Sequence, residues 1–477
     1  MAAALVDAGR SYGMPYLDDV SVPAPEGVGP MNLNVKGGLR SSPAGVYLQP
    51  VLERKNLTVV TEAQVVKLAL SGTRCTGLEF LWDGRRHSTR ASHEVVLCAG
   101  AIHTPRLLLL SGIGPPEELA PLGIDTAVDL PGVGRNLQDH PFLGGLCFEA
   151  KHPLAAPGHN LAGSVALWKS RSDLAVPDLE VLPAQVPLIS DEIAARYPMP
   201  PNVFCIVPCL ARVQSRGGLR MRTAEPNGPL EIQPNFLAEQ ADVDALAVGV
   251  ELGLGLAAQP AYRDLIGRWV APPKRLRREE TVAFIRRSWQ SHMHPVGTCA
   301  MGSGREAVVD AELRVRGVEG PRIADASVMP TIPSGPTNAP TVIIGEFASR
   351  LLAATWAADS AGAMRSQRAA RETREETPIA SAIRIPTLAP LPVYGDAAGI
   401  ADFDPYRRAP NDARSVEHRF DLALRRGLEP PGTNPAGIVD QDVEASECIE
   451  RLPQGERPTF LRADVRGDPG DRSTSLA

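Results

Sequence analysis

The sequence is poor in side chains that cross-link or ligate. Its 477 residues include 7 cysteines and 9 histidines, and aromatic residues make up 5% of the chain. The cysteines are odd in number and widely spread, which excludes a disulfide framework and a paired CxxC zinc pattern. Cys205 and Cys209 lie in the apolar run FCIVPCL, which is typical of thiols buried in a strand. We therefore expect a reducing compartment.

The sequence also lacks a basic block and a long apolar run. It has 49 Lys and Arg against 55 Asp and Glu, a net charge of −6, so we expect neither nucleic acid nor an anionic membrane as a partner. No run approaches the about 20 apolar residues of a membrane span. The start has no basic region followed by an apolar core, so no signal peptide is predicted. Together these absences predict a cytoplasmic protein.

The pattern that is present predicts a mixed α/β fold. From Asn56, β-branched runs separated by a Ser-Gly turn, a polar hairpin and the apolar strand EVVLCAG predict a sheet. The next run, AIHTPRLLLLSGIG, predicts a helix with Thr104 as its N-cap and Pro105 at the first helical position. A strand, a glycine and a helix start commonly present backbone N–H groups to an anionic ligand.

The rest of the chain predicts a second domain, a helix and a tail. Residues 143–293 alternate strand-like pieces with one helix-like run, which indicates a sheet-plus-helix domain. Residues 341–358 predict an amphipathic helix. Its predicted core-facing side chains are Val342, Ile343, Ile344, Phe347, Leu351 and Leu352. From residue 359 the sequence is charged and then rich in Pro, Gly, Asp and Arg, which predicts a charged helix followed by a mostly disordered tail.

One formal dinucleotide fingerprint, GLGLAA at residues 253–258, lies inside the helix-like run. A phosphate-binding G-x-G-x-x-G loop stands between a strand and a helix, so we reject this match. The segment SHMHPVGTCAMG, residues 291–302, raises a different question, because His292 and His294 could be ligands, core residues or proton carriers. A zinc site needs further ligands at a suitable spacing, and none is evident, so no metal is predicted.

Five blocks along the chain share one resemblance. They are GAIHTPRLLLLSGIG (residues 100–114), PGVGRNLQDH (131–140), HPVGTCAMG (294–302), VVDAELRVRGVEGPRIADASVMP (308–330) and TNAPT (337–341). In order and spacing they resemble the glucose-methanol-choline (GMC) family of flavin oxidoreductases, over residues 1 to about 358.

The resemblance implies a mixed α/β (α+β) fold, in which a partial Rossmann-like FAD-binding domain accompanies an antiparallel-sheet substrate domain. We expect residues 1–55 to form a lid or linker and residues 56–142 to form part of the FAD-binding domain. Residues 143–293 would form the substrate-binding domain. Residues 294–358 would return to the FAD-binding domain with the active-site histidine, and residues 359–477 would be the charged helix and disordered tail.

The resemblance also implies an activity, the FAD-dependent oxidation of the CH–OH group of a small-molecule alcohol. Its motif places the catalytic base at His294, which would accept the hydroxyl proton while a hydride passes to N5 of the flavin. A base with a pKa near 7 lowers this barrier, because a hydride leaves an alkoxide-like centre more readily than a neutral alcohol. His292 has no such assignment, and we expect it to support the site or to be structural.

Flavin contacts follow from the same resemblance. Val65 would lie against the adenine portion through its backbone, and Ala99 and Gly100 would lie near the dinucleotide, where small residues allow close approach. Asp325 and Ala326 would meet the diphosphate and ribityl region. The residues expected to border the isoalloxazine ring at a helix start are Asn338, Ala339, Pro340 and Thr341.

Two departures from the family pattern bear on activity. Pro336 stands where the family has an Asn or His that pairs with the catalytic histidine, and a proline side chain can neither donate nor accept a hydrogen bond. The family's N-terminal βαβ unit with its G-x-G-x-x-G loop is not found, so we expect a truncated flavin site that a separate chain could complete.

These departures leave alternatives open. The chain could be a noncatalytic remnant or a partner-binding protein, or it could be a lyase of the same fold. The identity of the alcohol and of the electron acceptor, and the choice between oxidase and dehydrogenase, do not follow from the sequence.

Overall fold

The computed structural model describes residues 1–154 and 163–372. Within the described residues, the part from Met1 to Glu346 forms one compact unit, and residues 347–372 belong to a second. Of the charged helix and tail predicted for residues 359–477, the part after residue 372 lies outside the described residues. None of the helices in the described ranges is long and apolar enough to cross a membrane.

The largest element of the first unit is an eight-stranded sheet whose recorded pairs are all antiparallel. Six strands run in the order β1-β13-β14-β15-β11-β19, and β12 pairs with β15 and β18. The strands are β1 (Gly27–Pro30), β11 (Pro141–Leu143), β12 (Cys147–Ala150), β13 (Ser164–Trp168), β14 (Leu179–Ala184), β15 (Val203–Leu210), β18 (Ile266–Ala271) and β19 (Trp289–Ser291). The sheet thus includes strands from outside the predicted domain of residues 143–293.

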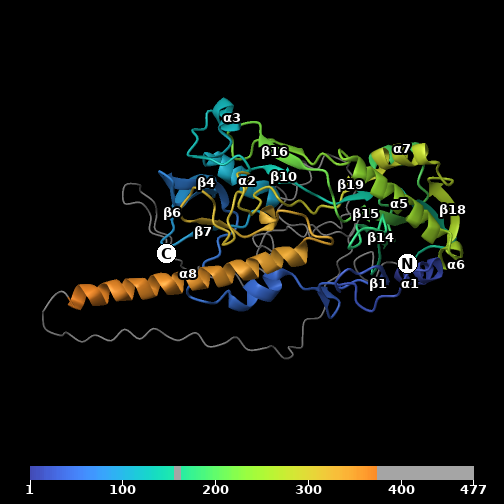
Figure 1. Ribbon diagram of the computed structural model, residues 1–477, viewed down its shortest axis with the longest axis horizontal. Coiled ribbons are helices and arrows are strands. Elements are labelled where there is room, and N and C mark those ends of the chain that lie inside the picture. The colour runs from blue at the N-terminus through green and yellow to red at the C-terminus, as the bar shows by residue number, and fades with distance from the viewer. Residues whose placement is uncertain (155–162, 373–477) are drawn as a thin grey trace. The chain divides into compact units, whose positions relative to one another are not determined.

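Strand β15 lies in the middle of this sheet, and each of its eight residues is buried. This agrees with the prediction that Cys205 and Cys209 are strand thiols. Helix α5 (Gln240–Ala257) packs against β14 and β15 (Figure 1). A Cβ atom added at Gly253 would lie 2.7 Å from Leu146 Cδ1, so the GLGL sequence serves close helix–sheet packing, as expected from rejecting it as a phosphate loop.

Shorter helices surround the sheet. Helix α1 packs on β1 and β13, so part of the segment predicted as a lid or linker, residues 1–55, belongs to the large sheet. These helices are α1 (Ala2–Tyr12), α4 (Asp191–Arg196), α6 (Pro260–Arg263) and α7 (Arg278–Ser288).

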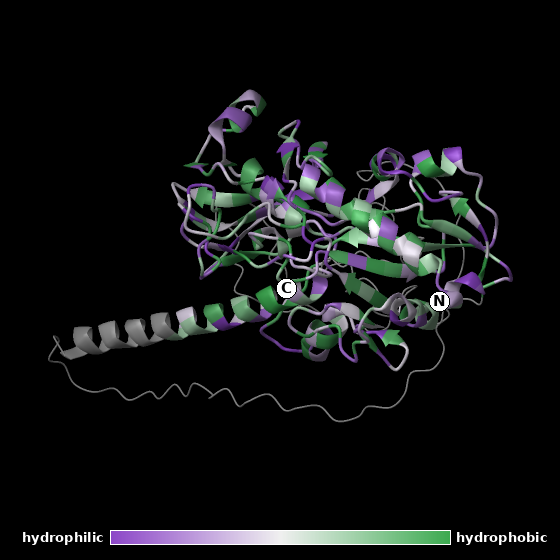
Figure 2. Ribbon diagram, turned by 45° about the vertical axis from the view of Figure 1, so that its right-hand side comes forward, coloured by the Kyte–Doolittle hydropathy of each residue, from purple (hydrophilic) through white to green (hydrophobic). Residues whose placement is uncertain are grey.

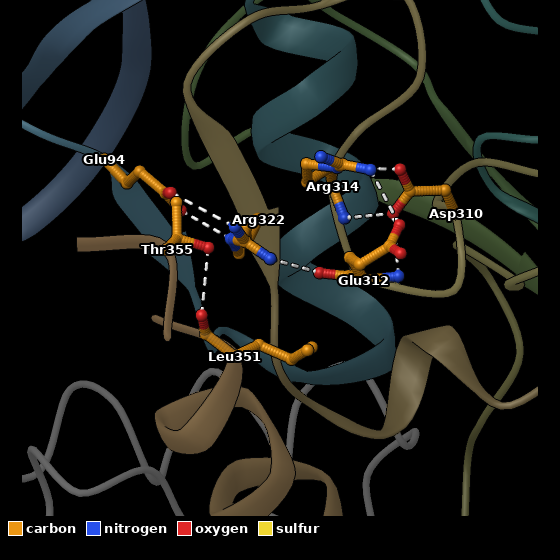
Figure 3. Close-up of polar contacts among 7 residues, drawn as sticks. All are labelled: Glu94, Asp310, Glu312, Arg314, Arg322, Leu351 and Thr355. Atoms are coloured by element: carbon orange, nitrogen blue, oxygen red, sulfur yellow. Dashed lines mark hydrogen bonds and ion pairs between the residues drawn. The ribbon is translucent and has the colours of Figure 1, made fainter. Parts of the chain in front are cut away.

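A second region combines a meander with a short parallel pair. Strands β4 (Gln64–Ser71), β5 (Arg74–Trp82) and β6 (Arg85–Arg90) are antiparallel, as the sequence predicts. Strand β7 (Val95–Leu97) runs parallel to β20 (Pro321–Ile323), although more than 200 residues separate them. At this pair Arg322 donates to Glu94 at 2.5 and 3.2 Å and to the Glu312 carbonyl at 2.5 Å (Figure 3).

Helix α2 (Gly100–Leu110) follows β7 directly. The prediction that it begins at Thr104-Pro105 is wrong, because the helix starts at Gly100 and both residues lie inside it. Proline has no N–H for the carbonyl four residues earlier. That carbonyl, on Ala101, accepts instead from the Thr298 hydroxyl at 2.6 Å. A tertiary hydrogen bond therefore makes the internal proline tolerable.

The remaining short elements connect these regions. They are β2 (Val35–Lys36), β3 (Leu39–Arg40), η1 (Ala44–Leu48), η2 (Gln49–Val51), β8 (Ile113–Gly114), α3 (Pro116–Leu119), η3 (Ala120–Leu122), β9 (Val128–Asp129), β10 (Arg135–Leu137), β16 (Gly217–Met221), β17 (Leu230–Gln233) and η4 (Ala326–Val328).

Helix α8 (Asn338–Glu372) begins three residues before the predicted helix and continues past it. The predicted core-facing stripe is only partly right. Ile343 is 65% exposed and Phe347 is 50% exposed, whereas Ala348 is buried. Hydrophobic residues near the beginning of α8 are visible in Figure 2. Periodicity identified the helix, but it could not show whether another segment covers each apolar side chain.

Candidate active site

The site is built where residues 138–141 run antiparallel to residues 291–296. In β11 and β19, Pro141 is paired with Ser291. The pairing continues beyond the strands, because the His292 N–H donates to the His140 carbonyl at 2.9 Å. Gln138 and Val296 then exchange two backbone hydrogen bonds of 2.9 and 3.0 Å. This register places His140 beside both histidines of the SHMH segment.

Asp139 holds the SHMH segment in place. Its buried carboxylate accepts from the Ser291 hydroxyl at 2.5 Å and from the His294 N–H at 2.9 Å. Between the two histidines, Met293 adopts a φ of 59°, which is uncommon for a residue other than glycine. The Met293 N–H donates to Ser291 Oγ at 2.9 Å, so local hydrogen bonds support this strained position.

Three buried imidazole rings meet at this point. The ring centroids of His292 and His294 are 4.4 Å apart, and those of His140 and His294 are 5.3 Å apart. His140 Nδ1 lies 3.1 Å from His294 Nδ1, and His140 Nε2 lies 3.0 Å from the carbonyl oxygen of Pro333. All three rings are at most 4% exposed.

These contacts determine which ring nitrogens carry protons. The Pro333 carbonyl can only accept, so His140 Nε2 must be the N–H donor. In neutral His140, Nδ1 is then an acceptor, and His294 Nδ1 must donate to it. The lone pair of His294 therefore lies on Nε2, where it can accept a proton from an alcohol.

Burial keeps the three rings neutral. It lowers the pKa of His140 to about 4 and, with the nearby His140 ring, the pKa of His292 to about 3. Burial and the two neighbouring rings also lower the pKa of His294 well below its ordinary value. A neutral imidazole at pH 7 is in the protonation state that a general base requires, but the lowered pKa makes His294 a weaker base than the one with a pKa near 7 expected from the sequence.

The same cluster bears on metal binding. The sequence offered no third ligand for His292 and His294, and the fold brings His140 to them, with one ring nitrogen of each within 4.8 Å of the others. Two of these rings already share a hydrogen bond through their Nδ1 atoms, so an ion could use those atoms only by displacing that bond. The absence of a metal therefore stays a prediction.

The parallel pair β7–β20 presents the features of a dinucleotide site. Ligands in such folds bind beyond the carboxyl ends of parallel strands. Here those ends lead into Ala99 and Gly100 on one side and Asp325 on the other, and the Ala324 N–H donates to the Leu97 carbonyl at 2.8 Å. Gly100 has a φ of 73°, and a Cβ atom there would meet no atom within 4 Å. The half-exposed start of α2 thus has room for a cofactor, and these residues fit one.

Asp325 connects the two strand ends. Its buried carboxylate accepts from the Gly100 N–H at 3.0 Å and from the Thr104 hydroxyl at 2.6 Å. It also accepts from the N–H and the hydroxyl of Ser327, at 2.8 and 2.5 Å. Its side chain is occupied by protein donors, which indicates that it holds the start of α2 against the turn that contains Ala326 and Ser327.

The histidine segment is attached to this turn. Besides the Thr298–Ala101 bond, the Gly297 N–H donates to the Ala326 carbonyl at 3.2 Å, and the Cys299 N–H donates to the Ser327 carbonyl at 2.8 Å. Ala99, Gly100, Asp325 and Ala326 are therefore joined to the chain that carries His294.

The other predicted cofactor residues lie nearby in the same unit. Half-buried Val65 is on β4, which packs against α2. The segment predicted to border the flavin ring, Asn338, Ala339, Pro340 and Thr341, forms the first turn of α8. Asn338 Oδ1 accepts from Asn34 Nδ2 at 3.0 Å. Their contacts with a flavin stay predictions.

Sequence reasoning missed two residues of this site. Asp139 and His140 end the PGVGRNLQDH block, from which the sequence supported the family resemblance but no role in the site. An acidic residue and a histidine directly before a strand were the available signal for both. Pro336 is exposed, and the hydrogen-bond partner of His294 that the fold supplies is His140.

Comparison with known proteins gives consistent matches. GMC oxidoreductase family models match residues 1–142, for the N-terminal domain, and residues 213–345, for the C-terminal domain. An uncharacterized GMC-type oxidoreductase of Mycobacterium bovis is 37% identical over 375 residues, which cover 74% of this chain and 70% of the relative. Mitochondrial choline dehydrogenase of Mus musculus is 35% identical over 376 residues, which cover 73% of this chain and 62% of that enzyme.

The fold has a matching counterpart among solved structures. The crystal structure of pyridoxine 4-oxidase from Mesorbium loti superimposes with a TM-score of 0.70 and 31% identity, and the match covers 73% of this chain and 69% of that one. GMC oxidoreductases use FAD. That a separate chain completes the flavin site stays a prediction. The matches over most of its described length show that this chain belongs to the GMC oxidoreductase family.

Proposed function

We propose that this chain oxidises the CH–OH group of a small-molecule alcohol, with FAD as cofactor and His294 as the base. The observation that carries the proposal is the hydrogen-bond chain from the Pro333 carbonyl through His140 to His294. It leaves the lone pair of His294 on Nε2, the nitrogen that does not contact His140. The similar proteins support the reaction class, because they include enzymes named for choline and pyridoxine.

The side chains of this chain take up the proton that the substrate hydroxyl loses. The hydroxyl of the substrate donates to His294 Nε2, which takes the proton as the carbon–oxygen double bond forms. The His294 imidazolium is then stabilised by its Nδ1–H bond to His140. Asp139 keeps the backbone of His294 in register throughout. Bound FAD supplies the acceptor for the hydride that leaves the carbinol carbon.

The cofactor would be held at the carboxyl ends of β7 and β20. Ala99 and Gly100 allow close approach at the start of α2, and Asp325 positions both this start and Ala326. The first turn of α8 would border the ring system. Because the histidine segment is bonded to the same loop, the base and the cofactor would keep a constant relative position.

The proposal is tested with the full chain supplied with FAD. Flavin retention after gel filtration is measured first, and reduction of the flavin by alcohols, including choline and pyridoxine, is then followed without oxygen. We expect His294→Gln to retain flavin but to slow its reduction about 10²–10⁴-fold. The matched control is His152→Gln, because His152 is exposed.

The alternatives give different results in this experiment. A lyase of the same fold would consume its substrate without reducing the flavin. A noncatalytic chain would show no alcohol-dependent reduction in the wild type, and that result would refute the proposed activity. Equal rates for the wild type and His294→Gln would refute the role of His294 alone.

A further inference from the structure

A carboxyl group lies buried on the face of the large sheet that carries the histidines. Directly paired residues of antiparallel strands point to the same face. Glu180 of β14 pairs with Cys209 of β15, and Cys209 pairs with Phe142 of β11. The alternate residues Leu179 and Pro208 face the opposite way, where they contact Gly249 of α5. Glu180 therefore points away from α5.

On this face Glu180 approaches the histidine cluster. A carboxylate oxygen of Glu180, the Sγ of Cys209 and a ring nitrogen of His292 all lie within 4.8 Å of one another. The Phe142 ring packs edge-on to the His292 ring, with centroids 5.6 Å apart. Glu180 is 5% exposed and His292 is 4% exposed.

Two polar groups here lack a protein partner. The Nδ1 atom of His292 is buried and has no hydrogen-bond partner within the described ranges. In those ranges no basic side chain forms an ion pair with Glu180, and none of its oxygens is recorded in a hydrogen bond. A buried carboxyl without a cation or a donor is unfavourable, so its retention needs another explanation. Burial raises the pKa of Glu180 to about 7, in line with this missing cation.

We propose that Glu180, with His292 beside it, is a specificity-determining residue that binds a protonated nitrogen of the substrate. The substrate class is an alcohol that carries an amine or a protonated pyridine. The inference rests on the proposed function, because His294 accepts the hydroxyl of the same molecule. His292 neighbours both groups, because one of its ring nitrogens lies within 4.8 Å of a Glu180 oxygen and its ring centroid is 4.4 Å from that of His294. One small molecule that carries both a nitrogen and a hydroxyl is therefore expected to reach both residues.

The chemistry of the groups around Glu180 fits such a nitrogen. An N–H group can donate to the Glu180 carboxylate, and its charge holds that carboxylate ionised. Neutral His292 offers a further acceptor or donor at its unpartnered Nδ1. The edge-to-face contact between Phe142 and His292 provides an apolar wall, which strengthens a charge pair by excluding water.

The test uses two phenols that differ in one group. 3-(Aminomethyl)phenol is cationic at pH 7 and 3-ethylphenol is its neutral counterpart, and neither can be oxidised because the carbon bearing the hydroxyl has no hydrogen. Their dissociation constants are measured by calorimetry with the full chain supplied with FAD. We expect the wild type to bind the cationic ligand about 10–100-fold more tightly.

Variants then assign the preference to the carboxylate. Glu180→Gln is expected to weaken binding of the cation at least about tenfold and to change binding of 3-ethylphenol less than about twofold. Glu192→Gln serves as the control because Glu192 is exposed on α4. Glu180→Met, which is uncharged and of similar volume, replaces the glutamine variant if the latter does not fold.

Two results would overturn the inference. Equal binding of the two phenols by the wild type would show that Glu180 does not recognise a cation and serves as an internal partner of His292. A preference that persists in Glu180→Gln would place the recognition elsewhere. If flavin reduction fails while the charge preference is present and depends on Glu180, the oxidation proposal is wrong and the binding site stands.

Discussion

The Nδ1 atoms of His140 and His294 lie 3.1 Å apart, and the other nitrogen of His140 is 3.0 Å from the Pro333 carbonyl. This relationship makes His140 a positioning residue that keeps the His294 lone pair on Nε2. We predict that His140→Leu lowers kcat/KM about 10–100-fold, because His294 can then adopt the wrong tautomer. The measurement is the pH profile of kcat/KM.

His140→Gln provides the conservative comparison. A glutamine amide can accept from His294 and donate to Pro333, so we expect it to recover most of the lost activity and the wild-type pH profile. If the leucine variant changes thermal stability but not the pH profile, His140 is only structural.

Asp325 accepts four hydrogen bonds at the proposed cofactor site, two from the start of α2 and two from Ser327. We predict that Asp325→Asn retains less FAD and lowers the free energy of unfolding by about 2–4 kcal/mol. The reason is that the amide NH2 group, which can only donate, would replace a carboxylate oxygen that accepts hydrogen bonds, so buried donors would lose their partner. Flavin content and thermal melting measure both effects. Asp310→Asn is the control, since Asp310 is bonded mainly to the exposed Arg314, and its expected cost is at most about 1 kcal/mol.

Gly297 links the histidine segment to the turn that contains Ala326. Its φ is 92°, and a Cβ atom would lie 2.6 Å from the Asn136 carbonyl oxygen. We predict that Gly297→Ala costs about 2–4 kcal/mol of stability, from left-handed backbone strain and overpacking. Gly304→Ala, with open space around its Cβ, is expected to cost less than about 0.5 kcal/mol. Urea denaturation of the two variants checks the difference, and similar midpoints would contradict it.

The histidine cluster predicts loss of stability in acid. The pKa values of His140 and His292 are lowered to about 4 and about 3, against an ordinary value of 6.5, and that of His294 is lowered in the same direction. The unfolded chain therefore binds more protons below about pH 6.5, and stability falls as the pH falls toward 4. Glu180, with its pKa raised to about 7, opposes this trend between pH 4.5 and 7.

Removing one histidine isolates its share of this effect. For His292→Gln we expect the dependence of unfolding free energy on pH, between pH 4.5 and 6, to decrease by about 1.4 kcal/mol per pH unit. Denaturant titrations across this range measure it. An unchanged slope would show that His292 can be protonated in the folded protein.

The ion pair between Arg322 and Glu94 supports the parallel strands (Figure 3). The Arg322 side chain is 3% exposed and that of Glu94 is 14% exposed. We predict that Glu94→Gln destabilises the protein by about 3–5 kcal/mol, because it leaves a buried guanidinium without its counter-ion. The double variant Glu94→Leu, Arg322→Met should recover much of this loss, and thermal melting of both variants provides the check. A similar loss in the double variant would show that packing, not charge, is responsible.

Much of the fold was predictable from local pattern. The β4–β6 meander, the buried β15 and α5 follow from periodicity and turn residues, which act over a few neighbours. The start of α2 was not predictable in this way. Pro105 resembles a first helical residue, but the Thr298 hydroxyl binds the carbonyl that the proline leaves free. The exposure of Ile343 likewise depends on which segments cover it.

The sequence by itself determined the family and named His294, because the blocks that carry the resemblance keep their order and spacing along the chain. Only the tertiary structure decided the state of that histidine. His140 is 154 positions from His294, and Glu180 is more than 100 positions from His292. Strand pairing sets such contacts through burial and backbone hydrogen bonds between distant segments, which local sequence does not encode. The tautomer of His294 and the unpartnered carboxyl beside His292 are therefore properties of the fold.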